Sequence, residues 1–189
     1  MPVKRLTRMS VLTAIALTIF IVELQIPSFV PIPGVKLGLA NIITIYAMFL
    51  LGPADTACIL IVRILLGSMF SGQVTALFYS LAGGVLCYLS MLRMRKLVTL
   101  RQIWVCSVIG AVAHNIGQIT VAILITNTPR LIYYLPVLMI SSVIAGIFTG
   151  LCAQYVIPWG YRNRAGYGKI VQNSRQRKTR PRGPRFPLP

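Results

Sequence analysis

Long apolar runs separated by basic clusters constrain the fold of this chain more than any other feature. The runs lie at about 9–26, 37–52, 53–70, 72–92, 102–126 and 134–157. A helix needs roughly 20 residues to cross the hydrocarbon core of a bilayer, which is about 30 Å thick. The sequence therefore predicts an all-α integral membrane protein, built as a bundle of six transmembrane helices. Gly52-Pro53 stops one helix and starts the next, so the second and third runs are predicted as separate spans.

The charges give this predicted bundle an orientation. Only Glu23 and Asp55 are acidic among the 189 residues, against 19 Lys and Arg. Most of the basic residues lie before the first run, between residues 93 and 101, or after residue 160. Because cytoplasmic loops of membrane proteins are rich in Lys and Arg, we predict that both termini and the 93–101 loop face the cytoplasm. The loops at 27–36 and 127–133 then face outward.

The composition also distinguishes between a nucleic-acid-binding protein and a membrane protein. A net charge of +17 is compatible with nucleic-acid binding, but the chain is 56% hydrophobic with a mean hydropathy of +0.77. These values favour a bilayer as the environment of the protein and make nucleic acid an unfavoured partner. We predict a multi-pass protein of the cell membrane.

The chain divides into two parts at about residue 160. Residues 1–160 are predicted as the six-helix transmembrane domain, and residues 161–189 as a basic cytoplasmic tail. The prolines and arginines between residues 181 and 189 predict that the tail is disordered. Three roles for it stay open: a solvated topology anchor, a contact with anionic lipid headgroups, or a contact with RNA.

The shortage of acidic residues excludes most enzyme classes. Metal-dependent phosphoryl or diphosphate chemistry needs several carboxylates, and glycoside hydrolysis needs a carboxylate pair. The sequence has one Asp, one Glu, one His and no Gly-x-x-x-x-Gly-Lys-Ser/Thr phosphate-binding loop. Its four cysteines stand singly inside predicted spans, without the spacing of metal ligands. We therefore predict no catalytic residues, no metal and no cofactor, which leaves binding and transport.

Arg63 is the sharpest polar feature inside a predicted span. It lies ten residues after Pro53, or about 15 Å along a helix, which places it near the middle of the bilayer. A charge at this depth costs at least ~2.5–3.5 kcal/mol and usually faces a partner or a cavity. Two alternatives stay open. Arg63 forms a structural ion pair with Glu23, or it binds a substrate carboxylate or phosphate.

The fifth span carries a second polar group. Gln118 follows Asn115 by three residues and His114 by four, so all three can share one broad helix face. That face either makes hydrogen bonds within the bundle or lines a cavity, and the two amides favour the cavity. Because other polar residues fall in the outer halves of their spans, we predict a pocket open to the outside. The candidate substrate-binding residues are Glu23, Lys36, Asn41, Arg63, Gln73, Tyr79, His114, Asn115 and Gln118.

Small residues recur every four positions on three of the spans. They are Ser10, Ala14 and Thr18; Ala76, Ser80 and Gly84; and Ser142, Gly146 and Gly150. Such faces let helices approach closely. We expect most of them to pack inside the bundle, whereas the stripe on the first span can instead dock a partner helix.

Five segments carry a resemblance to a known family. They are 31–42 (PIPGVKLGLANI), 52–53 (GP), 63–67 (RILLG), 79–84 (YSLAGG) and 110–118 (GAVAHNIGQ). Together they resemble the Gx transporter family, which often carries the label heptaprenyl diphosphate synthase component I. This family is similar to the substrate-binding S components of energy-coupling factor (ECF) transporters. The resemblance covers about residues 9–157 and leaves the basic tail outside.

The resemblance implies a six-helix protein of a bacterial cytoplasmic membrane that captures a small nutrient from outside. It implies a transmembrane coupling protein and two ATPases as partners, with Ser10, Ala14 and Thr18 of the first span docking the coupling protein. The predicted cargo is a vitamin or an isoprenoid or quinone precursor. Two alternatives stay open: a non-catalytic membrane component of heptaprenyl diphosphate synthesis, and a stand-alone secondary transporter with Glu23 as its coupling carboxylate.

Overall fold

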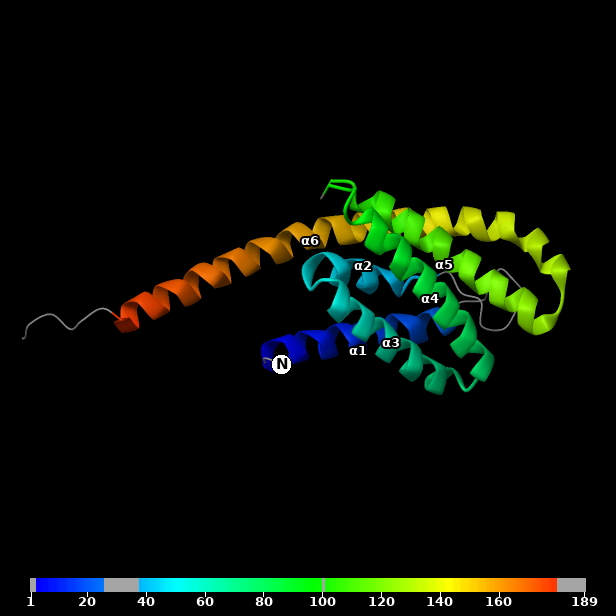
Figure 1. The fold of residues 1–189 in the computed structure, drawn as a ribbon, viewed down its shortest axis with the longest axis horizontal. Helices are drawn as coiled ribbons and strands as arrows, with labels where there is room; N and C mark the ends of the chain where they lie inside the picture. The colour runs from blue at the N-terminus through cyan, green and yellow to red at the C-terminus, as the bar shows by residue number, and fades with distance from the viewer. Residues whose placement is uncertain (1–2, 26–37, 100, 180–189) are drawn as a thin grey trace, which may run out of the picture.

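A computed structural model of the chain describes residues 3–25, 38–99 and 101–179, with side chains up to residue 160. Every element in these ranges is a helix, as predicted. The helices are α1 (Val3–Gln25), α2 (Asn41–Leu50), α3 (Pro53–Ser71), α4 (Val74–Met94), α5 (Ile103–Thr126), the 3₁₀ helix η1 (Pro129–Tyr134) and α6 (Leu135–Thr179). Figure 1 shows α1 to α5 and the first part of α6 lying side by side as one bundle.

Five segments are long and apolar enough to cross a membrane. They are α1, α3, α4, α5 and the segment Pro129–Gly160. The second predicted span, 37–52, is shorter than expected, because its helix α2 has only ten residues. Ten residues rise about 15 Å, which is half of a hydrocarbon core. The backbone explains the late start of α2, since Gly38 has a left-handed φ of 78° and a turn at Leu39 and Ala40 precedes Asn41.

Contacts between helix ends show which ends lie together. Arg5 near the start of α1 bonds to Asp55 near the start of α3, so these two helices begin at one end of the bundle. The hydroxyl of Tyr88, late in α4, donates to the carbonyl oxygen of Pro53 at 3.2 Å, so α4 runs toward that end. The first residues of α1 and the 93–99 segment therefore lie at the same end. Figure 1 shows α6 leaving the bundle at this end, as the six-pass topology requires.

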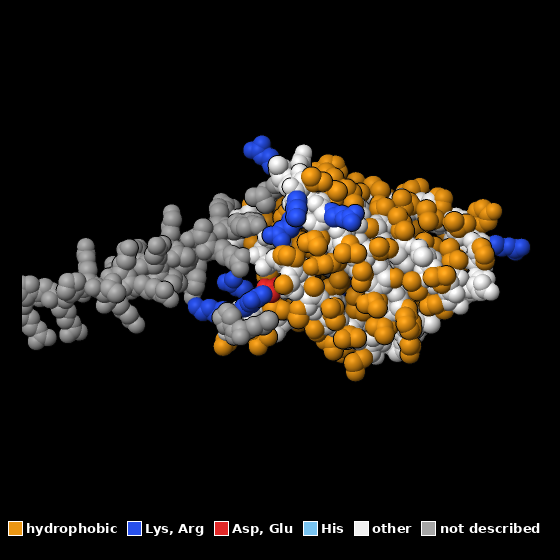
Figure 2. All heavy atoms as spheres, in the orientation of Figure 1, with side chains coloured by type: hydrophobic (Ala, Val, Ile, Leu, Met, Phe, Trp, Pro, Cys, Tyr) orange, Lys and Arg blue, Asp and Glu red, His pale blue; other side chains and the backbone are white. Residues whose placement is uncertain are grey.

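Most of the described Lys and Arg side chains gather at this end (Figure 2). Figure 2 shows most of the blue side chains there, near the place where α6 leaves the bundle, with apolar side chains covering the face between the two ends. We call this the basic end. Membrane proteins are oriented by such a difference in positive charge between their two ends, and their more basic end faces the cytoplasm.

Helix α5 is the centre of the bundle and packs against both α4 and α6 through glycines. A Cβ at Gly146 would lie 2.7 Å from the Val108 Cα, and a Cβ at Gly150 would lie 2.6 Å from the Trp104 Cα. Only glycine allows the α5 and α6 backbones to approach this closely. The small-residue faces of α4 and α6 are buried, as expected for internal packing.

Helix α6 continues beyond the predicted end of the sixth span. Its backbone is helical through Thr179 (Figure 1), whereas the sequence predicts that the tail begins at about residue 161. Pro158 lies inside the helix. The next proline is Pro181, and the residues between include many good helix formers, Arg, Lys and Gln. The predicted disorder of residues 180–189 lies outside the described residues.

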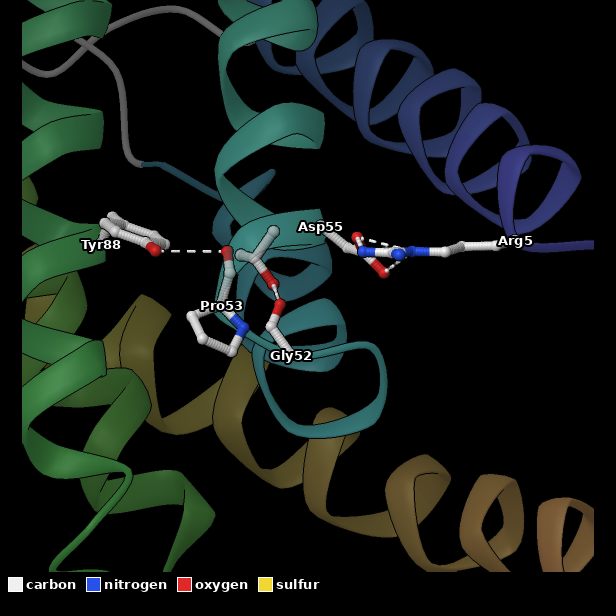
Figure 3. A network of polar contacts seen from close by, with 6 residues as sticks. Arg5, Gly52, Pro53, Asp55 and Tyr88 are labelled. Atoms are coloured by element: carbon white, nitrogen blue, oxygen red, sulfur yellow. Dashed lines mark hydrogen bonds and ion pairs between the residues drawn. The ribbon is translucent and has the colours of Figure 1, made fainter. Parts of the chain in front are cut away.

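An ion pair joins α1 to α3 at the basic end (Figure 3). The Arg5 Nε lies 2.9 Å from each carboxylate oxygen of Asp55, and the Arg5 Nη2 also donates to Oδ1. The Asp55 side chain is 6% exposed and the Arg5 side chain is 42% exposed. Paired donors on one carboxylate fix its geometry as well as its charge. The pair holds the first turns of α1 against the bundle.

Arg5→Gln is expected to lower the melting temperature of the protein, because the Asp55 carboxylate stays buried without its counter-charge. Adding Asp55→Asn should restore most of the loss, since no buried charge remains. Thermal unfolding of the wild type, both single variants and the double variant in detergent measures this coupling. Strictly additive shifts would contradict the role of the pair.

Candidate functional site

Four helices and one turn bring a cluster of polar side chains into the bundle. Glu23 comes from the end of α1, Arg63 from the middle of α3, Ser80 from α4, and His114 and Gln118 from α5. Each is at most 8% exposed. Together with Phe20 and Gly38 they line one small cavity. We call these seven residues the polar cluster.

Gly38 closes the cluster on the side of α2. Its backbone N–H donates to the Glu23 carboxylate, which links the end of α1 to the turn before α2. A Cβ at this position would lie 2.8 Å from the Asn41 amide nitrogen and 3.1 Å from the His114 Cδ2. Its left-handed φ and this close approach both require glycine. The turn therefore brings Asn41 and His114 close to Glu23.

Helix α4 closes the opposite side of the His114 ring. A Cβ at Gly83 would lie 2.9 Å from the His114 Cε1, Nδ1 and backbone oxygen. One turn along α5, a Cβ at Gly117 would lie 2.7 Å from the carbonyl oxygen of Ala82. The imidazole is thus packed between Gly38 and Gly83, and the contact between α4 and α5 fixes its position.

The cluster holds two opposite charges away from water. Arg63 is 5% exposed and Glu23 is 4% exposed, and the two side chains line the same cavity. The Arg63 Nε is buried and makes no hydrogen bond to any residue that the structure describes. Because a buried donor without a partner costs about 1–3 kcal/mol, this atom is a place where a bound group would add stability.

Asn41 adds unused hydrogen-bonding capacity beside the cluster. Its side chain is 4% exposed, and within the described part of the chain neither its amide nitrogen nor its oxygen has a hydrogen-bond partner. The nitrogen lies against Gly38, at the edge of the cavity. Buried polar groups in folded proteins usually have partners. A donor and an acceptor in this position are therefore able to bind a ligand's polar groups.

Three predicted site residues lie elsewhere. Asn115 faces α6, where its amide nitrogen donates to the Ser142 hydroxyl at 2.6 Å and to the Leu138 carbonyl oxygen at 3.3 Å. Tyr79 is buried in an apolar cluster with Ile119, Ala122 and Leu138. Gln73 is exposed at the N-terminus of α4. None of the three lines the cavity.

Four of the candidate residues line this cavity: Glu23, Arg63, His114 and Gln118. Asn41 adjoins it, and Lys36 lies outside the described residues. Phe20, Gly38 and Ser80 were not among the candidates. The sequence places Ser80 in a stripe of small residues that pack helices together, and for this reason it was not among the candidate polar residues. Its hydroxyl lies on the helix face that Gly83 and Gly84 turn toward the bundle.

The cavity has a volume of about 10 Å³. A space of this size holds about one water molecule, whereas pockets for organic ligands measure roughly 300–1,000 Å³. The described arrangement is therefore closed around the polar cluster. Within the described ranges, no three His, Cys, Asp or Glu side chains come close enough together to hold a metal ion.

The predicted docking stripe lies on the outside of α1. Ser10, Ala14 and Thr18 are all exposed, and the hydroxyls of Ser10 and Thr18 donate to carbonyl oxygens one turn earlier in α1. Ser10 and Ala14 also line an apolar groove of about 360 Å³ between α1 and α3. The stripe is thus accessible from the bilayer.

The fold and the cluster together define a class: an all-helical, multi-pass membrane protein that encloses opposite charges, a histidine and an amide in one polar cluster. Residues 12–156 match the family described as heptaprenyl diphosphate synthase component I. Since the match covers most of the chain, the protein belongs to this family, which confirms the family label predicted from the sequence. No curated relative and no solved structure matches the chain. The similarity to ECF S components stays a prediction.

Proposed function

We propose that this protein is the substrate-binding membrane subunit of an importer, similar to an ECF S component. One observation carries the proposal: Arg63, Glu23, His114 and Gln118 converge from three helices on one buried cavity. Ionisable groups inside a membrane bundle usually mark a substrate or ion pathway. Separate ATPase subunits would supply the energy, because the sequence has no phosphate-binding loop of its own.

The cargo is a small nutrient with an anionic group, such as a vitamin or an isoprenoid or quinone precursor. Arg63 supplies the positive charge, and its free Nε is able to donate to a carboxylate or phosphate oxygen. Asn41 and Gln118 supply amide donors and acceptors, and Glu23 orients Arg63. The cluster lies from the middle of α3 to the end of α1 that is remote from the basic end, so the cargo enters from the outside.

Binding requires the cavity to widen. A backbone hydrogen bond to Glu23 holds the turn at Gly38 to α1. The α4–α5 wall is held by backbone contacts at Gly83 and Gly117. We therefore assign the movement to the turn before α2. The exposed stripe on α1, at Ser10, Ala14 and Thr18, is the proposed contact with a coupling protein.

Ligand-dependent thermal stabilisation tests this function. The purified protein is heated with a panel of vitamins and of isoprenoid and quinone precursors. We expect at least one compound to raise the melting temperature of the wild type, as binding to the native state requires. Arg63→Ala should abolish the rise, and Arg130→Ala, an exposed arginine in η1, should preserve it. A compound whose effect survives changes at Glu23, Asn41, Arg63, His114 and Gln118 would refute the site.

A second candidate function follows from the family description: a non-catalytic membrane component of heptaprenyl diphosphate synthesis. The two proposals predict different partners. An importer subunit should co-purify from native membranes with ATPases, whereas a synthase component should co-purify with a soluble prenyl diphosphate synthase. Recovery of the synthase alone would favour the second function.

A further inference from the structure

A groove at the basic end is separate from the polar cluster. It has a volume of about 540 Å³ and lies between α1, α2 and the part of α6 near Gly160. Its walls include Arg8, Val11 and Ile15 from α1, Tyr46 and Leu50 from α2, and Trp159 from α6. The importer and synthase functions described above use none of these residues.

The groove changes from polar to apolar along α1. Thr7 and Arg8 lie toward the basic end, and Val11, Leu12 and Ile15 continue one to two turns deeper into the bundle. Val11 and Ile15 are 51% and 43% exposed, which places apolar side chains at the surface of a membrane-spanning helix. Trp159 is exposed at the polar end, where tryptophan prefers the interface between lipid and water. This order, from polar to apolar residues, fits a single amphiphilic molecule whose headgroup lies at Arg8 and whose apolar chain follows α1.

Neither acidic side chain of the chain pairs with Arg8. The sequence has only two acidic residues. Asp55 is bound by Arg5, and Glu23 lies at the other end of α1, beside Gly38. Basic pockets between helices on the cytoplasmic side of membrane proteins bind anionic lipid headgroups. The membrane itself therefore supplies the complementary ligand.

We propose that the groove between α1, α2 and α6 is a specific site for one anionic phospholipid. The phosphate of the headgroup binds Arg8, and an acyl chain follows Val11 and Ile15 toward the middle of the membrane. A bound lipid fills the space between α1, α2 and α6. The site thereby couples the position of α1 to the lipid composition of the leaflet at the basic end.

Native mass spectrometry of the full-length protein in mild detergent tests the site. The probes are phosphatidylglycerol and phosphatidylcholine with identical acyl chains. We expect the wild type to bind one phosphatidylglycerol in preference to phosphatidylcholine. Arg8→Gln should weaken phosphatidylglycerol binding about fivefold, the effect of one basic residue near an anionic lipid. Arg93→Gln, which removes an exposed charge at the same end but away from the groove, should leave binding unchanged.

A second variant tests the apolar part of the groove. Val11→Trp keeps Arg8 but fills the space of the acyl chain, so it should lower binding of both lipids. All variants change exposed side chains, and thermal unfolding checks that they are folded. Equal weakening by Arg8→Gln and Arg93→Gln would overturn the proposal, because it would show general surface attraction. Equal binding of the two lipids to the wild type would overturn it as well.

Discussion

Arg63→Met should cause a large loss of stability, and adding Glu23→Gln should restore most of it. Both side chains are at most 5% exposed and line the same cavity. Removing one member of a buried pair of charges leaves the other uncompensated, at a cost of about 3–5 kcal/mol. Replacing both with neutral groups removes this penalty. Glutamine at position 23 also keeps an oxygen that accepts the hydrogen bond from the Gly38 N–H.

The measurement is thermal unfolding of the two single variants and the double variant in the same detergent. Arg130→Met serves as the control, because it makes the same chemical change at an exposed position in η1. It should shift the melting temperature little. If the loss of melting temperature in the double variant equals the sum of the losses in the two single variants, the two charges do not stabilise each other. The polar cluster would then need a different explanation.

The double variant also separates a structural role of Arg63 from a binding role. It should be folded and close to the wild type in stability, yet it should gain no stability from a compound that stabilises the wild type. A purely structural ion pair predicts the opposite, namely that the ligand response survives once the fold is restored. The sequence leaves these two alternatives open, and this variant decides between them.

The apolar runs predicted the helical bundle well, because the length of a membrane-spanning helix must match the thickness of the hydrocarbon core. Five runs became segments able to span it. The second did not, because hydropathy does not report backbone conformation. The left-handed φ of Gly38 and the turn that follows delay the start of α2 to Asn41. Gly38 carries this signal in the sequence, but a count of apolar residues ignores it.

The charged part of the site could be predicted because Glu23, Arg63 and His114 are rare residue types inside apolar spans. The amides and tyrosine were harder, because small rotations of a helix decide which neighbour faces the cavity. Asn115 follows His114 by one residue, about 100° around the helix, and it therefore faces α6 instead. In the same way Ser80 lines the cavity, whereas Tyr79 packs against apolar residues.

The Gly83→Ala variant should be strongly destabilised, whereas Gly84→Ala should stay close to the wild type. The new Cβ at position 83 would lie 2.9 Å from the backbone oxygen of His114 and 2.9 Å from two atoms of its ring. The backbone oxygen cannot move without separating α4 from α5. Overpacking of this kind costs about 1–3 kcal/mol, which exceeds the gain in helix propensity of up to about 1 kcal/mol from glycine to alanine.

Gly84→Ala is the matched control, since it makes the same change one residue further along the same helix. Its Cβ would lie 2.9 Å from the Ile64 Cδ1 and 3.3 Å from the Leu60 Cδ1, which are the far ends of flexible side chains. These atoms move at little cost, and the gain in helix propensity offsets it. Thermal unfolding of both variants, with and without a stabilising compound, measures the difference. Equal melting temperatures would show that the α4–α5 contact at His114 is loose.

The comparison also tests which wall of the cavity moves. If the turn at Gly38 opens and the α4–α5 wall stays fixed, Gly83→Ala should reduce the ligand response, because it displaces His114 on the fixed side. Gly84→Ala should retain that response, because its neighbours on α3 yield without moving the imidazole. If ligand entry instead separates α4 from α5, a side chain at position 83 would favour the open form. Gly83→Ala would then bind the compound at least as well as the wild type while melting at a lower temperature.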